Sequence, residues 1–304
     1  MKKLLILLLA MFSLAGCGTQ VARDDGRVNV VATVGMVGDM VENIGGDFVS
    51  VKSLMGPGVD PHLYQPSAGD IAKLENADVV FYVGLHLEGK MVEIFESLAE
   101  KKPVFALSDV LDEKLLLDPQ VGQTGNYDPH IWFDVGLWSG TVVAVRDALS
   151  EFDPENAETY KVNAEAYLKK LTELDAWVQK GIDLIPENQR LMITAHDAFN
   201  YFGEAYGMDV RGIQGISTAA DFGLKDLEKL IDLIVEREVP AIFVESSVSK
   251  KSIEALQEGV IARGWNVEIG GVLFSDAMGD FGTEEGTYLG MVRHNVNVIV
   301  NSLK

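Results

Sequence analysis

Cysteine, basic side chains and long apolar segments are all scarce in this chain of 304 residues. The single cysteine excludes a fold held together by disulfides. Basic residues number 25 against 46 acidic ones, and the resulting net charge of −21 repels the phosphates of nucleic acids, so we expect no nucleic-acid partner. Beyond the N-terminal segment, no apolar run reaches the ~18 residues of a membrane-spanning helix. The composition of the whole chain, with 47% hydrophobic and 23% charged residues, indicates a globular protein of roughly two domains.

The N-terminus has the organisation of an export signal. Lys2 and Lys3 precede an apolar stretch that ends in Leu14-Ala15-Gly16-Cys17. This ending resembles the lipobox of bacterial lipoproteins, in which cleavage before the cysteine is coupled to its acylation. We therefore expect residues 1–16 to be a removed signal peptide, Cys17 to carry lipid, and residues 17–26 to be a polar tether. The alternative is a plain secretory signal with an incidental cysteine.

The body of the chain alternates short β-rich runs with amphipathic helical patterns. Strands are predicted over eight runs, at 28–34, 51–54, 79–83, 104–106, 190–194, 209–213, 241–244 and 267–270. Helices are predicted at 36–44, at 68–76, from about Asp197, at 224–237, and from a cap at Ser249 to 263. This alternation is typical of parallel sheets flanked by helices, so the predicted fold class is α/β.

One helical segment differs from the others by its length. Asp153-Pro154 is a strong helix start, and apolar residues then recur every three or four positions to about 183. Some 28 residues would span about 42 Å, enough to connect two lobes. We predict an N-terminal lobe at 27–152, a linking helix at 153–183 and a C-terminal lobe at 184–304. The alternative is an ordinary long helix within one domain.

Three of the five histidines share a structural context. His62 and His130 each end an Asp-Pro-His tripeptide, and His196 follows the predicted strand at 190–194. Open α/β sheets bind ligands at the carboxyl ends of their strands, and a preceding proline restrains the backbone that carries an imidazole. The carboxylates of Asp276 and Glu245 occupy similar positions. Three histidines and one carboxylate would suit a borderline divalent ion such as Zn²⁺.

The other candidate residues have simpler interpretations. His86 lies in a short loop and His294 in the predicted C-terminal helix, and we expect both to be structural or solvated. The Gly279-Asp280-Phe281-Gly282 run lacks the strand–loop–helix frame of a phosphate site. A single histidine more often has a structural role than a ligating one. Only the repeated tripeptide and the positions at strand ends favour a shared site.

Five motifs, taken in order, resemble those of a known family. They are Gly-Pro-Gly-Val-Asp-Pro-His62, Asp-Pro-His130-Ile-Trp-Phe-Asp, Thr-Ala-His196-Asp-Ala-Phe, Phe-Val-Glu245-Ser-Ser and Phe-Ser-Asp276-Ala-Met-Gly. From about 28 to 303 the chain resembles the cluster A-I (cluster 9) metal-binding lipoproteins of bacterial ABC importers, especially the TroA-type zinc/manganese receptors. The resemblance implies two α/β lobes joined by a single long helix. It also implies one metal ion at their interface, bound by His62, His130, His196 and Asp276.

The resemblance also implies a function, and it leaves the identity of the metal open. Manganese-preferring relatives often have Glu at the third ligand position, where this chain has His196. Zinc-specific relatives often carry a His-rich loop before the second ligand, but residues 112–128 contain no histidine. The expected protein captures Zn²⁺ or Mn²⁺ outside the cytoplasm and delivers it to the permease of an ABC importer. It is expected to be a monomer without enzymatic activity, held by lipid at the outer face of the cytoplasmic membrane or on the periplasmic side.

Two other classes of protein fit parts of the pattern. A secreted zinc-dependent hydrolase would need an open coordination position and a general base, for which Glu245 is the candidate. A receptor for an organic solute would use the histidines structurally. In the metal-receptor interpretation, Glu245 holds the second ring nitrogen of a ligating histidine from outside the site.

Overall fold

The computed structural model describes residues 26–118, 127–219 and 223–304. Its N-terminal part contains a parallel four-stranded sheet in the order β2-β1-β3-β4. The strands are β1 (Val28–Ala32), β2 (Val49–Ser53), β3 (Val79–Tyr82) and β4 (Val104–Ala106). β1 and β3 are rich in buried valine, as expected for the central strands of a sheet covered on both faces. β2 lies on one side of β1, and β3, the next strand along the chain, lies on the other side. The strand order therefore reverses beside β1, which makes a topological switch point.

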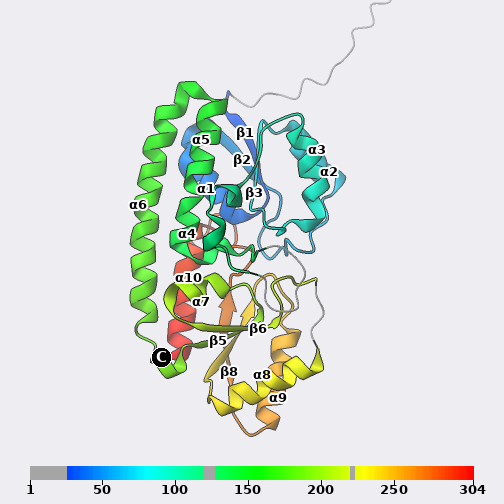
Figure 1. Cartoon of the computed structure of the whole chain (residues 1–304), viewed down its shortest axis with the longest axis vertical. Helices are drawn as coiled ribbons and strands as arrows, with labels where there is room; N and C mark the ends of the chain where they lie inside the picture. The colour runs from blue at the N-terminus through cyan, green and yellow to red at the C-terminus, as the bar shows by residue number, and fades with distance from the viewer. Residues whose placement is uncertain (1–25, 119–126, 220–222) are drawn as a thin grey trace, which may run out of the picture.

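Helices cover both faces of this sheet (Figure 1). α1 (Gly35–Gly45) and α5 (Val142–Phe152) lie on one side, and α2 (Ala68–Asn76) and α3 (Val92–Ala99) lie on the other. α2 begins with a capping box, in which Ser67 and Asp70 bind each other's backbone N–H groups. The short α4 (Val135–Gly140) precedes α5.

The C-terminal part contains two pairs of parallel strands. β5 (Leu191–His196) pairs with β6 (Asp209–Gln214), and β7 (Ala241–Glu245) pairs with β8 (Glu268–Leu273). β5 also lies beside β7, so the ends of all four strands meet at one edge. The helices of this part are α7 (Asn200–Tyr206), α8 (Leu224–Glu236), α9 (Lys251–Ala262) and α10 (Tyr288–Leu303). All eight predicted strands and the α/β class are thereby confirmed.

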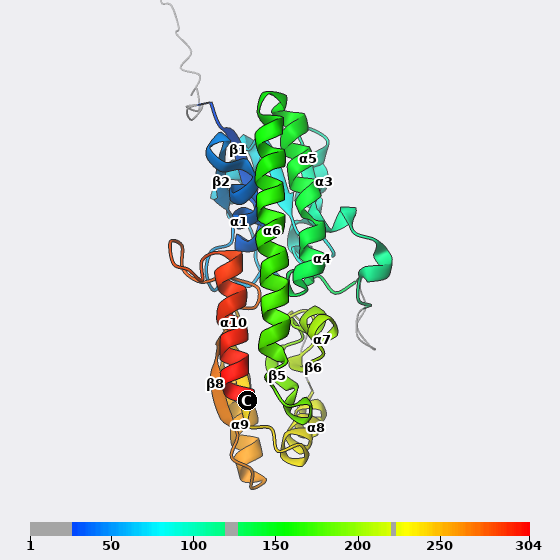
Figure 2. The same ribbon diagram turned by 90° about the vertical axis from the view of Figure 1, so that its left-hand side faces the viewer.

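The predicted long helix is α6 (Ala157–Ile182), a helix of 26 residues that runs along both lobes (Figure 2). Its buried residues follow the predicted apolar stripe: Tyr160, Ala164, Tyr167, Leu171, Leu174, Val178 and Ile182. α10 lies alongside its lower half. The predicted division into 27–152, 153–183 and 184–304 stays a prediction, and we use it below to name the lobes. None of the helices in the described ranges is long and apolar enough to cross a membrane.

Three predicted helix starts were wrong in detail. Asp153 precedes a 3₁₀ turn, and its carboxylate accepts hydrogen bonds from the side chains of Asn156 and Tyr160 instead of capping the backbone. Lys250, not Ser249, is the cap of α9. α7 begins at Asn200, and the carboxylate of Asp197 accepts the backbone N–H of Gly212 on β6 at 2.6 Å. Asp197 is thereby held by a neighbouring strand, whereas Asp153 binds residues three and seven positions ahead of it in the chain.

The two lobes share a hydrophobic core. Successive residues of β5 and β7 point to opposite faces, as a strand requires. Ile193 and Ile242 pack towards α8 and α9, whereas Met192 and Phe243 join the core of α6, α10 and the N-terminal sheet. The strands that end at the candidate site are therefore held from both faces.

Candidate metal centre

Four separate segments bring the predicted ligands together. His62 lies in a turn after β2, His130 precedes the 3₁₀ turn at Ile131–Phe133, His196 is the last residue of β5, and Asp276 follows β8. One ligand atom from each of the four residues lies within 4.8 Å of the other three, and this group is the metal-compatible cluster found in the described residues. His62 is 7% exposed and the other three are at most 1% exposed.

All three imidazoles direct Nε2 towards the same point. His62 Nε2 and His130 Nε2 are 3.3 Å apart. The carboxylate of Asp276 lies against the same point, with Oδ1 at 3.3 Å from His130 Nε2 and Oδ2 at 3.3 Å from His196 Nε2. Asp276 Oδ2 is 3.8 Å from His62 Nε2. Such spacings are those of donors grouped around a small shared centre.

Several atoms of this cluster lack the partners that buried polar groups normally have. Within the described chain, both carboxylate oxygens of Asp276 and Nε2 of His196 are buried without a hydrogen bond. An unsatisfied polar group in a protein interior costs free energy, and native proteins seldom contain one without a reason. A cation at the centre would supply the missing interaction to each of these atoms.

The repeated Asp-Pro-His tripeptide has a local structural explanation. In both copies the aspartate accepts the backbone N–H of the histidine two residues later, from His62 to Asp60 Oδ1 at 2.9 Å and from His130 to Asp128 Oδ1 at 3.0 Å. This is the Asx turn, and the intervening proline restrains the backbone within it. The backbone of each histidine is thereby held by a contact within its own segment.

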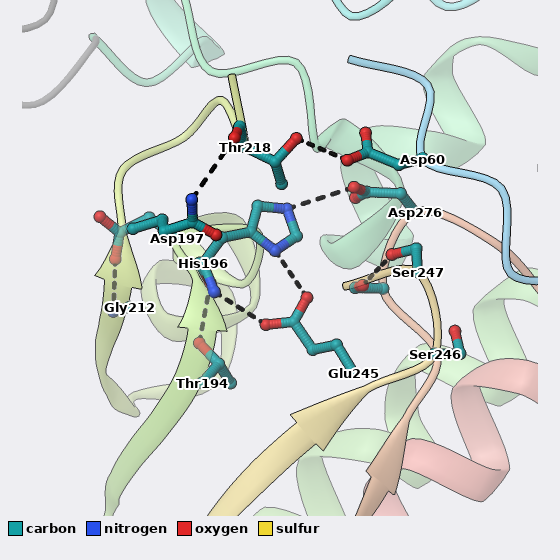
Figure 3. A network of polar contacts seen from close by, with 12 residues as sticks. Asp60, Thr194, His196, Asp197, Gly212, Thr218, Glu245, Ser246, Ser247 and Asp276 are labelled. Carbon is teal, nitrogen blue, oxygen red and sulfur yellow. Dashed lines mark hydrogen bonds and ion pairs between the residues drawn. The ribbon is translucent and has the colours of Figure 1, made fainter. Parts of the chain in front are cut away.

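Two carboxylates support the imidazoles from outside the cluster. Asp128 Oδ1 is 2.7 Å from His130 Nδ1, and Glu245 Oε2 is 2.6 Å from His196 Nδ1. The Glu245 contact is electrostatic, because the two atoms are not aligned as a hydrogen bond. Glu245 Oε1 also accepts the backbone N–H of His196 at 2.9 Å (Figure 3). Glu245 lies where the sequence analysis placed it, whereas the role of Asp128 was missed even though its tripeptide had been noticed.

Burial and charge act differently on the three histidines. Burial lowers the pKa of His62 to about 3 and makes its imidazole neutral. For His130, burial also opposes the charged form, but Asp128 and Asp276 outweigh it and raise the pKa to about 9. His196 behaves similarly, because Glu245 and Asp276 overcome its burial and raise its pKa well above the usual range. In the metal-free protein, protons therefore take the place of the cation at two of the three imidazoles.

The remaining predicted residues lie away from the cluster. His86 is exposed, in a loop where its φ is +65°. His294 is on α10, with Nε2 at 3.0 Å from the carbonyl oxygen of Val272. Both therefore have the structural or solvated character expected of them. Cys17 lies outside the described residues.

Comparison with known proteins agrees with this geometry. Residues 30–302 match the family described as ZnuA, zinc-uptake complex component A, periplasmic. The chain belongs to this family. It is 49% identical to the manganese-binding lipoprotein MntA of Bacillus subtilis, over 98% of this chain and 97% of that protein. It is 47% identical to the zinc-binding protein TroA of Treponema pallidum, over 94% of this chain and 92% of that protein.

A solved structure of a family member also resembles the fold described above. The periplasmic zinc-binding protein TroA from Treponema pallidum superposes with a TM-score of 0.88 and 47% sequence identity, over 91% of this chain and 99% of that one. The predicted family and the predicted fold class are both confirmed.

Proposed function

We propose that this protein captures a divalent transition metal ion, Zn²⁺ or Mn²⁺, outside the cytoplasm and delivers it to the permease of an ABC importer. The observation that carries the proposal is the buried cluster of three imidazole Nε2 atoms and two carboxylate oxygens that lack a hydrogen bond, contributed by both lobes. It is supported by relatives named as manganese-binding and zinc-binding proteins, and by relatives named as substrate-binding lipoproteins of metal ABC transporters. His62, His130, His196 and Asp276 are the proposed ligands.

The geometry favours binding over hydrolysis. A zinc hydrolase keeps a coordination position open for water and needs a free general base beside it. Here four buried protein groups converge on one centre. The candidate base, Glu245, is engaged through both of its oxygens with the backbone and ring of His196. The metal ion is thus the cargo of the protein, and a reaction centre is not needed to explain the site.

Metal analysis of the purified protein tests this function. The metal-free wild-type protein should bind one Zn²⁺ or one Mn²⁺ in titration calorimetry, with the bound ion counted by mass spectrometry. His130→Ala and Asp276→Ala should each weaken binding by at least about 10-fold. His294→Ala is the matched control, because it removes an imidazole outside the cluster. Equal binding by all four proteins would contradict the proposal, as would a wild-type protein that binds neither ion.

The anchor, partner and oligomeric state require separate tests. We expect Cys17→Ser to leave metal binding intact and to move the protein from the membrane fraction to the soluble fraction. A Cys17→Ser protein that remains in washed membranes would contradict lipidation at this residue. Delivery to a permease predicts that cells lacking the chain lose uptake of the radioactive metal and regain it with wild-type protein but not with Asp276→Ala. Light scattering of the soluble protein should give a monomer.

A further inference from the structure

Residues 127–135 belong to the N-terminal lobe by sequence, but their polar contacts reach the other lobe. Tyr201 on α7 donates its hydroxyl hydrogen to the carbonyl oxygen of Asp128 at 2.9 Å. The same hydroxyl accepts the backbone N–H of Leu117 at 3.0 Å. Asn200, also on α7, donates from Nδ2 to Asp128 Oδ2 at 2.9 Å. The carboxylate that holds His130 is therefore itself held by α7.

The second half of this segment is attached to the C-terminal lobe as well. Trp132 donates its indole N–H to the carbonyl oxygen of Ser275 at 3.1 Å, next to Asp276. Tyr288 donates its hydroxyl hydrogen to the carbonyl oxygen of Trp132 at 2.7 Å. The rings of Phe133 and Phe199 lie 4.1 Å apart between centroids. These contacts extend the attachment along the chain on both sides of His130.

The loop that carries His62 is attached to the C-terminal lobe much more lightly. Among the described residues, a side-chain hydrogen bond connects this loop to that lobe: Thr218 Oγ1 donates to Asp60 Oδ2 at 2.6 Å (Figure 3). The carbonyl oxygen of Leu63, on the other side of His62, accepts from Lys90 of its own lobe. His62 is also the most exposed of the four proposed ligands. The solvent side of the site is therefore the side of this loop.

From this asymmetry we infer that the site divides three to one when it opens: His130, His196 and Asp276 stay together on the C-terminal lobe, and His62 alone leaves. The inference rests on the proposed function and deepens it. Asn200 and Tyr201 are positioning residues, because they act on His130 through Asp128. Moving His130 away would break several buried hydrogen bonds, whereas moving His62 breaks the Thr218–Asp60 bond.

This division has a consequence for release of the ion. With His62 withdrawn, the metal keeps three protein ligands and gains one open position, where water or a ligand group of a receiving protein can bind. Transfer can then begin without complete loss of coordination. The Thr218–Asp60 hydrogen bond keeps the His62 loop closed until that exchange.

Hydrogen exchange of the full-length protein, with and without Zn²⁺, tests the division. Removing the metal should speed exchange in peptides covering 56–66, while 128–135 should stay as protected as 191–196. If exchange became faster in both 56–66 and 128–135 while that of 191–196 did not change, the inference would be overturned and a two-to-two division indicated. A wild-type protein that binds no metal would instead overturn the proposed function, so the two failures are distinguishable.

Ligand variants make the same test sharper. In His62→Ala, Zn²⁺ should still bind, at least about 10-fold more weakly, but should no longer slow exchange at 56–66. In His130→Ala, Zn²⁺ should bind with a similar loss and still slow exchange at 56–66. The same response of 56–66 in both variants would contradict a special role for His62.

A tyrosine pair tests the positioning residues. Tyr201→Phe should raise the rate at which a chromophoric chelator removes Zn²⁺ by about 10-fold and should raise exchange at 128–135. Tyr82→Phe, which removes a hydroxyl from the N-terminal sheet, is the control and should change neither. A purely structural role of Tyr201 would lower the midpoint of thermal unfolding and leave the release rate unchanged, and that result would overturn the assignment.

Discussion

Two carboxylates outside the cluster orient the imidazoles of His130 and His196. Asp128 and Glu245 each face an Nδ1 atom, which favours a proton on that nitrogen, so that loss of the other proton leaves the electron pair on Nε2, where the metal binds. His196 is fixed twice by Glu245, through its ring and through its backbone N–H. The proposed ligands thus arrive at the centre with their tautomer and their direction already set.

Replacing Glu245 tests this arrangement at a single atom. Glu245→Gln keeps the shape of the side chain but offers one acceptor where the glutamate offers two. The amide NH₂ must then face either the backbone N–H of His196, which loses its acceptor, or ring Nδ1, which favours the tautomer with its proton on Nε2. We expect Zn²⁺ affinity to fall by about 10–100-fold in titration calorimetry. Glu268→Gln, an exposed change on β8, is the control, and an unchanged affinity for Glu245→Gln would assign that residue a structural role.

The pH dependence of binding follows from the same pKa shifts. A ligand must lose its proton to bind a metal, so a histidine with a raised pKa competes with the metal below that pKa. Because the pKa of His130 is raised to about 9 and that of His196 is also raised well above its ordinary value, affinity should increase from pH 6 to pH 9. Calorimetry at pH 7.5 in buffers of different ionisation enthalpy should report release of about two protons. Binding without proton release would contradict the shifts.

The residues that the sequence could identify are those that a local motif marks. Asp-Pro-His marks His62 and His130, and the end of a β-rich run marks His196 and Glu245. Thr218 and Tyr201 could not be identified in this way, because their partners Asp60 and Asp128 are far away in the sequence and only the fold brings them together.

At the scale of helices, one buried carboxylate lies where α1, α6 and α10 meet. Asp39 on α1 accepts a hydrogen bond from the hydroxyl of Tyr167 on α6 at 3.3 Å, and the backbone N–H of Tyr288 on α10 also stabilises its charged form. Burial outweighs both contacts and raises the pKa of Asp39 to about 6. The folded protein therefore holds a proton at this position more tightly than the unfolded chain does.

The sign of the resulting pH effect can be measured. Because the folded pKa lies above the ordinary value of 3.8, the charged carboxylate costs stability at neutral pH, and stability rises as pH falls from about 7 towards 4. The difference corresponds to at most about 3 kcal/mol. Asp39→Asn should increase the free energy of urea unfolding at pH 7.5 and have little effect at pH 4. A loss of stability at pH 7.5 would mean that the hydrogen bond to Tyr167 outweighs burial.

The elements themselves were easier to predict than their ends. Runs such as Val79–Tyr82 are recognisable because buried parallel strands are rich in β-branched residues. The start of α7 was misplaced, because Asp197, near which that helix was expected to begin, binds the backbone N–H of Gly212 on β6 instead. The sequence also could not show that β8, an edge strand, is covered by α10, whose Asn295 binds both backbone groups of Phe274.

At the scale of the whole molecule, the two lobes are less independent than their sequence ranges suggest. One hydrophobic core runs from the N-terminal sheet through α6 and α10 to one face of β5 and β7. The other face of the same two strands forms the smaller core with α8 and α9. Because β5 and β7 pack on both faces, a strand that moved out of one core would also lose its contacts in the other. Opening of the site is therefore expected to be a small displacement, and separation of the lobes would break the core.

This shared core predicts how the protein unfolds. We expect a single cooperative transition for the metal-free chain, with equal calorimetric and van't Hoff enthalpies. Two tryptophans serve as independent probes, because Trp138 is in the large core and Trp265 packs against the small one. Single-tryptophan variants that keep only one of these residues should show coincident fluorescence transitions. A chain ending at residue 183 should fail to fold, since Leu174, Val178 and Ile182 on α6 would lose the partners that bury them. Earlier unfolding at Trp265, or a folded 27–183 fragment, would show instead that the lobes are separate domains linked only by α6.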